Sequence, residues 1–190
     1  MSAGRLQPGI AAHLAASAAK GASGLAGLDP DQARRASAAG QALGTSPDEP
    51  VVPSRDVVLD LPGRRIPGRL YSAHPGGDRP GPVVVWYHGG GFVLCDLDSA
   101  DGICSRLAIA TGATVLSVGY RLAPEHPWPA AHDDAAEALA WVHAHAATLG
   151  VDAGRIAVAG DSAGATLAAH AATAPSGPGS GWPSRCSSTR

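Results

Sequence analysis

Cysteine is scarce in this sequence, and long apolar runs are missing. Its three cysteines, Cys95, Cys104 and Cys186, are odd in number and show no C-x-x-C spacing. This usage argues against a disulfide scaffold or a zinc site and fits a reducing compartment, so we expect a cytoplasmic location. No apolar run is long enough to span a bilayer. Residues 10–19 are mildly apolar, but His13 interrupts them and no clear cleavage site follows, which favours an exposed or lid-type helix over a signal peptide.

Charge is also sparse. Charged residues make up 16% of the 190 residues, and the net charge is −2 at pH 7. This balance gives no electrostatic reason to expect nucleic acid or an anionic membrane as a partner. Lys20 is the sole lysine, and the abundance of Ala, Gly, Pro and Arg is typical of GC-rich coding DNA, which suggests a bacterial source. The hydrophobic content of 45% is sufficient for one domain with a core.

Residues 1–50 are rich in Ala, Gly and Ser, and we interpret them as an N-terminal cap-like or flexible segment. Asp29 or Asp31 is expected to cap a helix that runs through residues 33–39. Prolines then mark a linker at residues 44–53.

Strand and helix patterns alternate after this linker. Two short strands are predicted at residues 57–59 and 66–71, and a turn at residues 61–64 joins them into a hairpin. Buried strands are expected at residues 82–87, 113–118 and 156–159, and helices at residues 98–110, 128–149 and 165–174. The first helix should bury Ile103, Leu107 and Ala110, and the second Ala135, Leu139 and Val142. The pattern predicts an α/β fold: a mostly parallel sheet with an N-terminal antiparallel hairpin and helices on both faces.

The last predicted strand ends in Gly160-Asp161-Ser162-Ala163-Gly164, which fits G-x-S-x-G. Strand, tight turn and helix are the context in which this motif forms a nucleophile elbow, so Ser162 is the candidate nucleophile. Gly160 and Gly164 flank it because the backbone there should come too close to its neighbours for larger side chains. We interpret Asp161 as a local hydrogen-bonding partner.

A second motif, His88-Gly89-Gly90-Gly91-Phe92, follows the strand at 82–87. It could be a plain turn or a phosphate cradle, but no G-x-x-x-x-G-K-[ST] pattern is present. Our interpretation is an oxyanion loop, in which the N–H groups of Gly89 and Gly90 act together with that of Ala163. His88 then has the structural role of fixing the turn.

A third motif lies between these two, Tyr120-Arg-Leu-Ala-Pro-Glu-His-Pro-Trp-Pro-Ala-Ala131. With all three motifs in order, the chain resembles the hormone-sensitive-lipase-like branch of the α/β-hydrolases, the bacterial family IV esterases, from about residue 28 to residue 174. The resemblance implies a partial catalytic domain at residues 51–174, a cap-like N-terminal segment, a small-molecule carboxylic ester as substrate, and no cofactor or metal. The chain departs from the family pattern at Ala165-Thr166, where Gly-Asn is usual, and at Cys95, where glycine is usual; we interpret Cys95 as an inert thiol.

No Asp or Glu follows Ser162, and His170 is the sole later histidine. In this fold the catalytic acid and base follow the serine in the chain. His170 should lie along the flank of the sheet, and the earlier candidates are better interpreted as structural or solvated groups: His126, His132, His143, His145 and Asp133. The alternatives are therefore an active carboxylesterase, a truncated non-catalytic fragment of one, and, third, a binding protein or scaffold on the same sheet.

Residues 175–190 have no strand or helix pattern, and we expect a disordered tail. Read two nucleotides later, the codons for residues 181–190 give a pattern close to the Leu-Ala-x-x-Val-Leu-Val-Tyr-Pro strand of the family. We therefore expect a frameshift, which sequencing the gene would test. A sheet that stops after the elbow strand would also have an exposed edge there, so self-association is expected.

Overall fold

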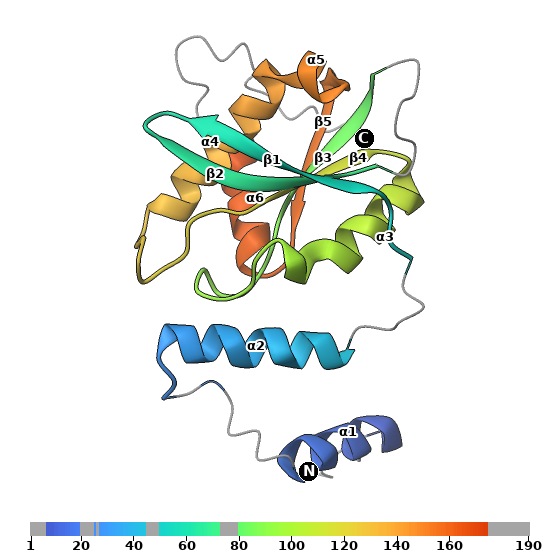
Figure 1. Ribbon diagram of the computed structural model, residues 1–190, viewed down its shortest axis with the longest axis vertical. Helices are drawn as coiled ribbons and strands as arrows, with labels where there is room; N and C mark the ends of the chain where they lie inside the picture. The colour runs from blue at the N-terminus through green and yellow to red at the C-terminus, as the bar shows by residue number, and fades with distance from the viewer. Residues whose placement is uncertain (1–6, 20–24, 26, 45–49, 73–79, 175–190) are drawn as a thin grey trace, which may run out of the picture.

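The computed structural model describes residues 7–19, 25, 27–44, 50–72 and 80–174 (Figure 1). The expected disordered tail at 175–190 and residues 45–49 of the expected linker at 44–53 lie outside these residues. The domain boundaries predicted from the sequence therefore stay predictions.

Five strands form one mixed sheet in the order β1-β2-β4-β3-β5. The strands are β1 (Ser54–Leu61), β2 (Arg64–Tyr71), β3 (Gly81–Tyr87), β4 (Thr114–Val118) and β5 (Val151–Gly160). The pairs β1–β2 and β2–β4 are antiparallel, whereas β3 pairs with β4 and β5 in parallel. The predicted hairpin and mostly parallel sheet are both confirmed, although β5 begins five residues earlier than its apolar run predicted.

Helices cover both faces of the sheet, as expected (Figure 1). On one face, α4 (Ala130–Ala144) and α6 (Ala163–Thr173) pack on β3 and the hairpin; on the other, η1 (Asp98–Ala100) and α3 (Asp101–Thr111) cover β4 and Trp86. The predicted helix at 128–149 is interrupted at His145, after which a short α5 (Ala146–Leu149) ends at Gly150 in the left-handed conformation (φ 73°). Ala135, Leu139 and Val142 are buried as predicted.

The predicted buried face of α3 is only partly right, because Leu107 is half-buried and packs against the core but Ile103 and Ala110 do not. Ile103 is 38% exposed and Ala110 is exposed, whereas Cys104, Ser105 and Ala108 face the sheet. The helical period is therefore right, but the buried face is shifted by one residue from the predicted one.

Two further helices precede the sheet, α1 (Pro8–Ala19) and α2 (Pro30–Gly44). Asp29 caps α2 as predicted: its Oδ1 accepts from the Gln32 N–H (2.8 Å), and Gln32 Oε1 accepts from the Asp29 N–H (3.2 Å). These reciprocal bonds form a capping box, which satisfies two N–H groups at the start of the helix. No helix among the described residues has the length and hydrophobicity needed to cross a membrane.

Candidate active site

Ser162 lies at the junction of β5 and α6, in the position expected of the nucleophile elbow. Its backbone has φ 51° and ψ −118°, a conformation that non-glycine residues rarely adopt, and the residue is exposed. The turn that carries it is closely packed. A Cβ on Gly164 would overlap the carbonyl oxygen of Tyr87, and one on Gly160 would lie 2.5 Å from the same oxygen. The elbow therefore rests directly on the end of β3, which is the reason predicted for its two glycines.

Asp161 connects the elbow to the glycine loop. Its Oδ1 accepts a hydrogen bond from the Gly89 N–H at 2.9 Å. The interpretation of Asp161 as a local hydrogen-bonding partner agrees with this contact. The predicted role of Gly89 as an oxyanion donor does not agree with this contact, because its single N–H group already donates to Asp161.

The N–H groups of Gly90 and Gly91, the next two residues of the loop, have no partner among the described residues. The Gly90 carbonyl accepts from the N–H groups of Val93 (3.1 Å) and Leu94 (2.8 Å). In contrast, the N–H groups of Gly90, Gly91 and Ala163 donate to no residue in the part of the chain that the structure describes. Gly90 and Gly91 have φ values of 103° and 62°, so this turn needs the conformational freedom of glycine.

His88 and Tyr120 hold the start of the glycine loop through contacts with its carbonyl groups. The two rings are buried and stack with centroids 4.3 Å apart and an interplanar angle of 18°. The Tyr120 hydroxyl donates to the His88 carbonyl at 2.7 Å, and His88 Nδ1 lies 2.8 Å from the Gly89 carbonyl oxygen. Burial lowers the pKa of His88, so its imidazole is neutral at pH 7. These contacts agree with the structural role expected for His88.

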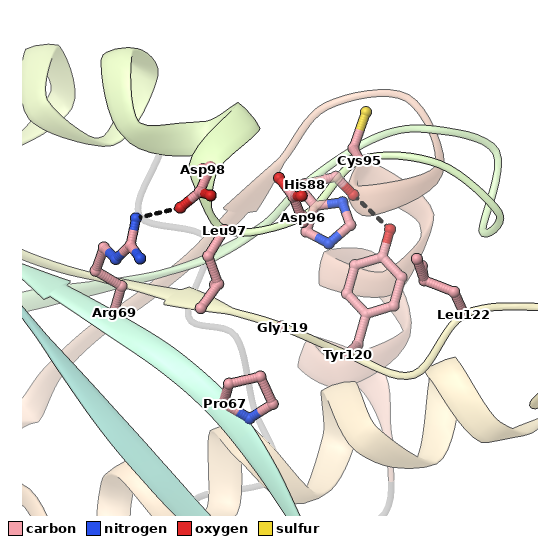
Figure 2. Close-up of a pocket in the computed structure, with 10 residues that line it drawn as sticks. All are labelled: Pro67, Arg69, His88, Cys95, Asp96, Leu97, Asp98, Gly119, Tyr120 and Leu122. Atoms are coloured by element: carbon pink, nitrogen blue, oxygen red, sulfur yellow. Dashed lines mark hydrogen bonds and ion pairs between the residues drawn. The ribbon is translucent and has the colours of Figure 1, made fainter. Parts of the chain in front are cut away.

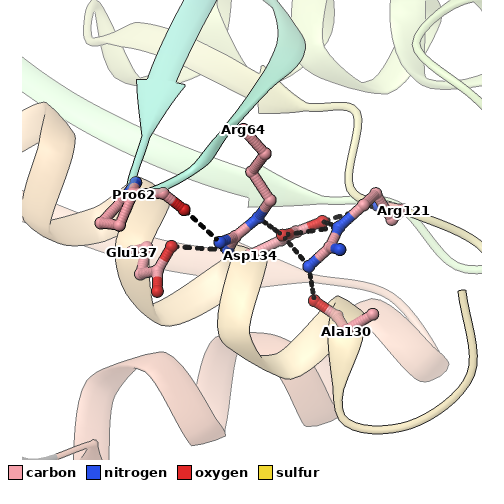
Figure 3. Close-up of polar contacts among 6 residues, drawn as sticks. All are labelled: Pro62, Arg64, Arg121, Ala130, Asp134 and Glu137. Carbon is pink, nitrogen blue, oxygen red and sulfur yellow. Dashed lines mark hydrogen bonds and ion pairs between the residues drawn. The ribbon is translucent and has the colours of Figure 1, made fainter.

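A buried carboxylate anchors the start of the middle motif (Figure 3). Asp134 on α4 is fully buried and accepts from the Arg121 N–H at 2.8 Å, from the Arg121 guanidinium at 2.9–3.1 Å, and from Arg64 Nε at 2.6 Å. Burial raises the pKa of Asp134, but the hydrogen bonds from Arg121 and Arg64 outweigh it and leave this pKa below its usual value. Asp134 therefore joins α4, the hairpin and the segment after β4.

Arg34 fixes α2 to the two loops of the site. Its guanidinium donates to the carbonyls of Val93 (2.9 Å) and Ala123 (3.0 Å) and forms a bidentate ion pair with Glu125 at 2.8 and 2.6 Å. Gln41, further along α2, donates to the Cys95 thiol at 3.3 Å. The N-terminal helix α2 is thus attached to the segment that follows the glycine loop.

A cavity of about 340 Å³ has His88 and Tyr120 among the residues of its wall (Figure 2). Pro67, Leu97 and Leu122 give it apolar sides, while Arg69, Asp96 and Asp98 give it a polar end. Ser162 does not line this cavity. The cavity therefore lies next to the side chains that hold the glycine loop, and Ser162 is not part of its wall.

Three of the histidines considered as catalytic bases make contacts with other aromatic rings. His132 stacks on Phe92 (centroids 5.6 Å apart) and meets the ring of His170 edge-on at 5.2 Å, while His145 stacks on Trp141. Among the described residues, no histidine or carboxylate forms a hydrogen bond with the Ser162 hydroxyl, and no group of three or more His, Cys, Asp or Glu side chains is arranged to hold a metal ion.

Comparison with known proteins identifies the fold family of the chain. A family profile described as the alpha/beta hydrolase fold matches residues 84–178. The chain belongs to the α/β-hydrolase fold family. It is 50% identical over 133 residues to Esterase LipI of Mycobacterium tuberculosis, covering 68% of this chain and 42% of that protein. It is also 40% identical over 171 residues to Ethyl acetate hydrolase of Pseudomonas putida, covering 86% of this chain and 53% of that protein.

Among solved structures of α/β-hydrolases, the hyperthermophilic esterase from the archaeon Pyrobaculum calidifontis superposes with a TM-score of 0.81 at 40% identity. The match covers 89% of this chain and 53% of the esterase. These relatives confirm the fold and the resemblance to the hormone-sensitive-lipase-like branch. The chain spans about half the length of the relatives that it matches.

Sequence reasoning missed three residues of this α/β-hydrolase site: Tyr120, Asp134 and Arg34. Tyr120 lay inside the middle motif, so the motif pointed to it without giving it a role. Asp134 and Arg34 gave no signal, since each lies in an ordinary charged stretch of a helix.

Proposed function

We propose that this chain carries the nucleophile and the oxyanion hole of a serine-dependent carboxylic ester hydrolase. Ser162 would attack the ester carbonyl, and a water molecule would then hydrolyse the acyl-enzyme. The observation that carries the proposal is the elbow conformation of Ser162 together with the Asp161–Gly89 hydrogen bond, which holds the glycine loop beside the elbow.

The oxyanion donors in this proposal are the N–H groups of Gly90, Gly91 and Ala163. Among the described residues these three N–H groups have no other hydrogen-bond partner, whereas that of Gly89 is used by Asp161. Acyl transfer places negative charge on the carbonyl oxygen, and each oriented donor is worth about 3–4 kcal/mol at the transition state. The N–H group of Gly89 instead holds the loop to Asp161. His88 contacts the loop, and Gly160 and Gly164 allow the elbow to pack against the end of β3.

The acid and base of the triad are not assigned to any described residue. In this fold the acid and the base follow the serine in the chain, and this chain spans about half the length of the relatives that it matches. The second candidate is therefore a non-catalytic fragment of such an enzyme. It is favoured by the lack of any hydrogen bond between Ser162 and a described histidine or carboxylate.

The test is hydrolysis of p-nitrophenyl acetate by the 190-residue chain and by Ser162→Ala. We expect slow release of p-nitrophenol that depends on Ser162, at a rate about 10⁴-fold or more below that of an intact esterase of the family. Thr166→Ala is the matched control, because it removes an exposed hydroxyl one helical turn further along α6. Release that is equal in parent and Ser162→Ala would refute the nucleophile, and turnover close to that of an intact esterase would refute the fragment.

We also propose that the chain self-associates through β5. This strand is the last of the described sheet and pairs with β3 alone among the described strands, so within the described residues its other edge is unpaired. Sedimentation velocity over a range of concentrations should detect a dimer, and a monomer at all concentrations would contradict this expectation.

A further inference from the structure

We infer that Tyr120 is a positioning residue that sets the direction of the Gly90 N–H group. The inference rests on the proposed function and deepens it, since Gly90 is one of the proposed oxyanion donors. Tyr120 would act through the loop and would not touch the substrate.

The Tyr120 hydroxyl meets two consecutive carbonyl groups. It donates to the His88 carbonyl at 2.7 Å (Figure 2). It also lies 3.3 Å from the Gly89 carbonyl. The Gly89 carbonyl is also 2.8 Å from His88 Nδ1. Because a carbonyl oxygen can only accept, Nδ1 must carry the proton in this contact. Both carbonyls therefore point toward the Tyr120 side of the loop.

Because each peptide is planar, the direction of its carbonyl also determines the direction of its N–H group. In a planar trans peptide the carbonyl and the N–H that it is bonded to point in opposite directions. The peptide between His88 and Gly89 shows the result, since its carbonyl meets Tyr120 and its N–H meets Asp161 of the elbow at 2.9 Å. The next peptide has its carbonyl on the same side, so the Gly90 N–H also points toward the side of the elbow.

Tyr120 is itself held rigidly. It is 3% exposed, its ring stacks on His88, and the next residue, Arg121, donates its N–H to the buried Asp134 at 2.8 Å. Burial raises the pKa of Tyr120, so its hydroxyl remains a donor throughout the pH range of an assay.

Tyr120→Phe tests the inference, because it keeps the ring and removes the hydroxyl. Loss of one oxyanion donor costs about 10²–10³-fold in rate, and a donor that is misdirected but present should cost on the order of tenfold. We therefore expect the Ser162-dependent acylation rate with p-nitrophenyl acetate to fall about tenfold while KM stays unchanged. Tyr87→Phe is the matched control, since it removes a buried hydroxyl that donates to the Ala135 carbonyl at 2.8 Å, away from the loop.

A crystal structure of Tyr120→Phe gives a second readout that does not depend on activity. The peptide between Gly89 and Gly90 is expected to rotate, so that the Gly90 N–H no longer points toward the elbow. An unchanged peptide, an unchanged rate, or equal rate losses in Tyr120→Phe and Tyr87→Phe would each overturn the inference. If the parent chain shows no acylation of Ser162, the proposed function fails, and the orientation of this peptide alone decides the role of Tyr120.

Discussion

Replacing Asp134 by alanine should destabilise the protein more than any other single loss of a charge among the ion pairs described above. The substitution removes a carboxylate that is fully buried and that accepts from Arg64, from the Arg121 side chain and from the Arg121 backbone (Figure 3). Removing one partner of a buried ion pair costs about 3–5 kcal/mol, because it leaves the other charge without compensation.

The contacts that remain place the expected loss near the lower end of this range. Arg64 keeps its bond to the Pro62 carbonyl (3.1 Å) and an ion contact with Glu137 at 2.5 Å that lacks hydrogen-bond geometry. Both arginines also reach solvent, with side chains that are 19% and 27% exposed. We therefore expect Asp134→Ala to lower the free energy of unfolding by about 3 kcal/mol at pH 7.

The loss should depend on pH in a defined direction. The pKa of Asp134 is lower in the folded protein than its ordinary value of about 3.9, so its contribution is fully present above pH 4 and is lost as the pH falls through the folded-state pKa. The difference in stability between the parent and Asp134→Ala should therefore shrink below about pH 4.

Urea denaturation followed by circular dichroism measures this difference at several pH values. Asp60→Ala is the control, because Asp60 pairs with Arg65 at 2.8 Å while both side chains are at least 70% exposed. Exposed pairs of this kind contribute about 0–1 kcal/mol. The reasoning is refuted if Asp134→Ala costs less than about 1 kcal/mol, or no more than Asp60→Ala.

Two further substitutions test the elbow and the attachment of α2. Gly164→Ala should lower the free energy of unfolding by more than about 4 kcal/mol and so prevent stable folding, because its Cβ would overlap the Tyr87 carbonyl. Gly81→Ala is the control and should cost less than about 1 kcal/mol, because its Cβ would meet nothing within 4 Å. Thermal or urea unfolding measures both losses, and equal losses would contradict this account. Arg34→Ala should increase amide hydrogen exchange across α2, because four hydrogen bonds to Val93, Ala123 and Glu125 are lost, whereas the exposed Arg35→Ala should leave exchange unchanged. Unchanged exchange in Arg34→Ala would show that other contacts hold α2.

The local patterns of the sequence were sufficient for most of the fold. Apolar β-branched runs located β3 and β4, the period of Ala135, Leu139 and Val142 located the buried face of α4, and Asp29 marked the start of α2. These features depend on neighbours within a few residues along the chain, so spacing alone determines them. The same holds for the elbow, where G-x-S-x-G implies a tight turn with glycines at two fixed positions.

Contacts between distant segments could not be predicted in this way. Gly89 and Asp161 are 72 positions apart, and only their hydrogen bond moves the proposed donors from Gly89 to Gly90 and Gly91. The α3 register failed for a similar reason, since burial depends on which side the sheet occupies and not on the apolar period alone. The sequence by itself therefore predicted the elbow and the glycine loop beside it, while the tertiary structure decided which N–H groups of that loop have partners among the described residues.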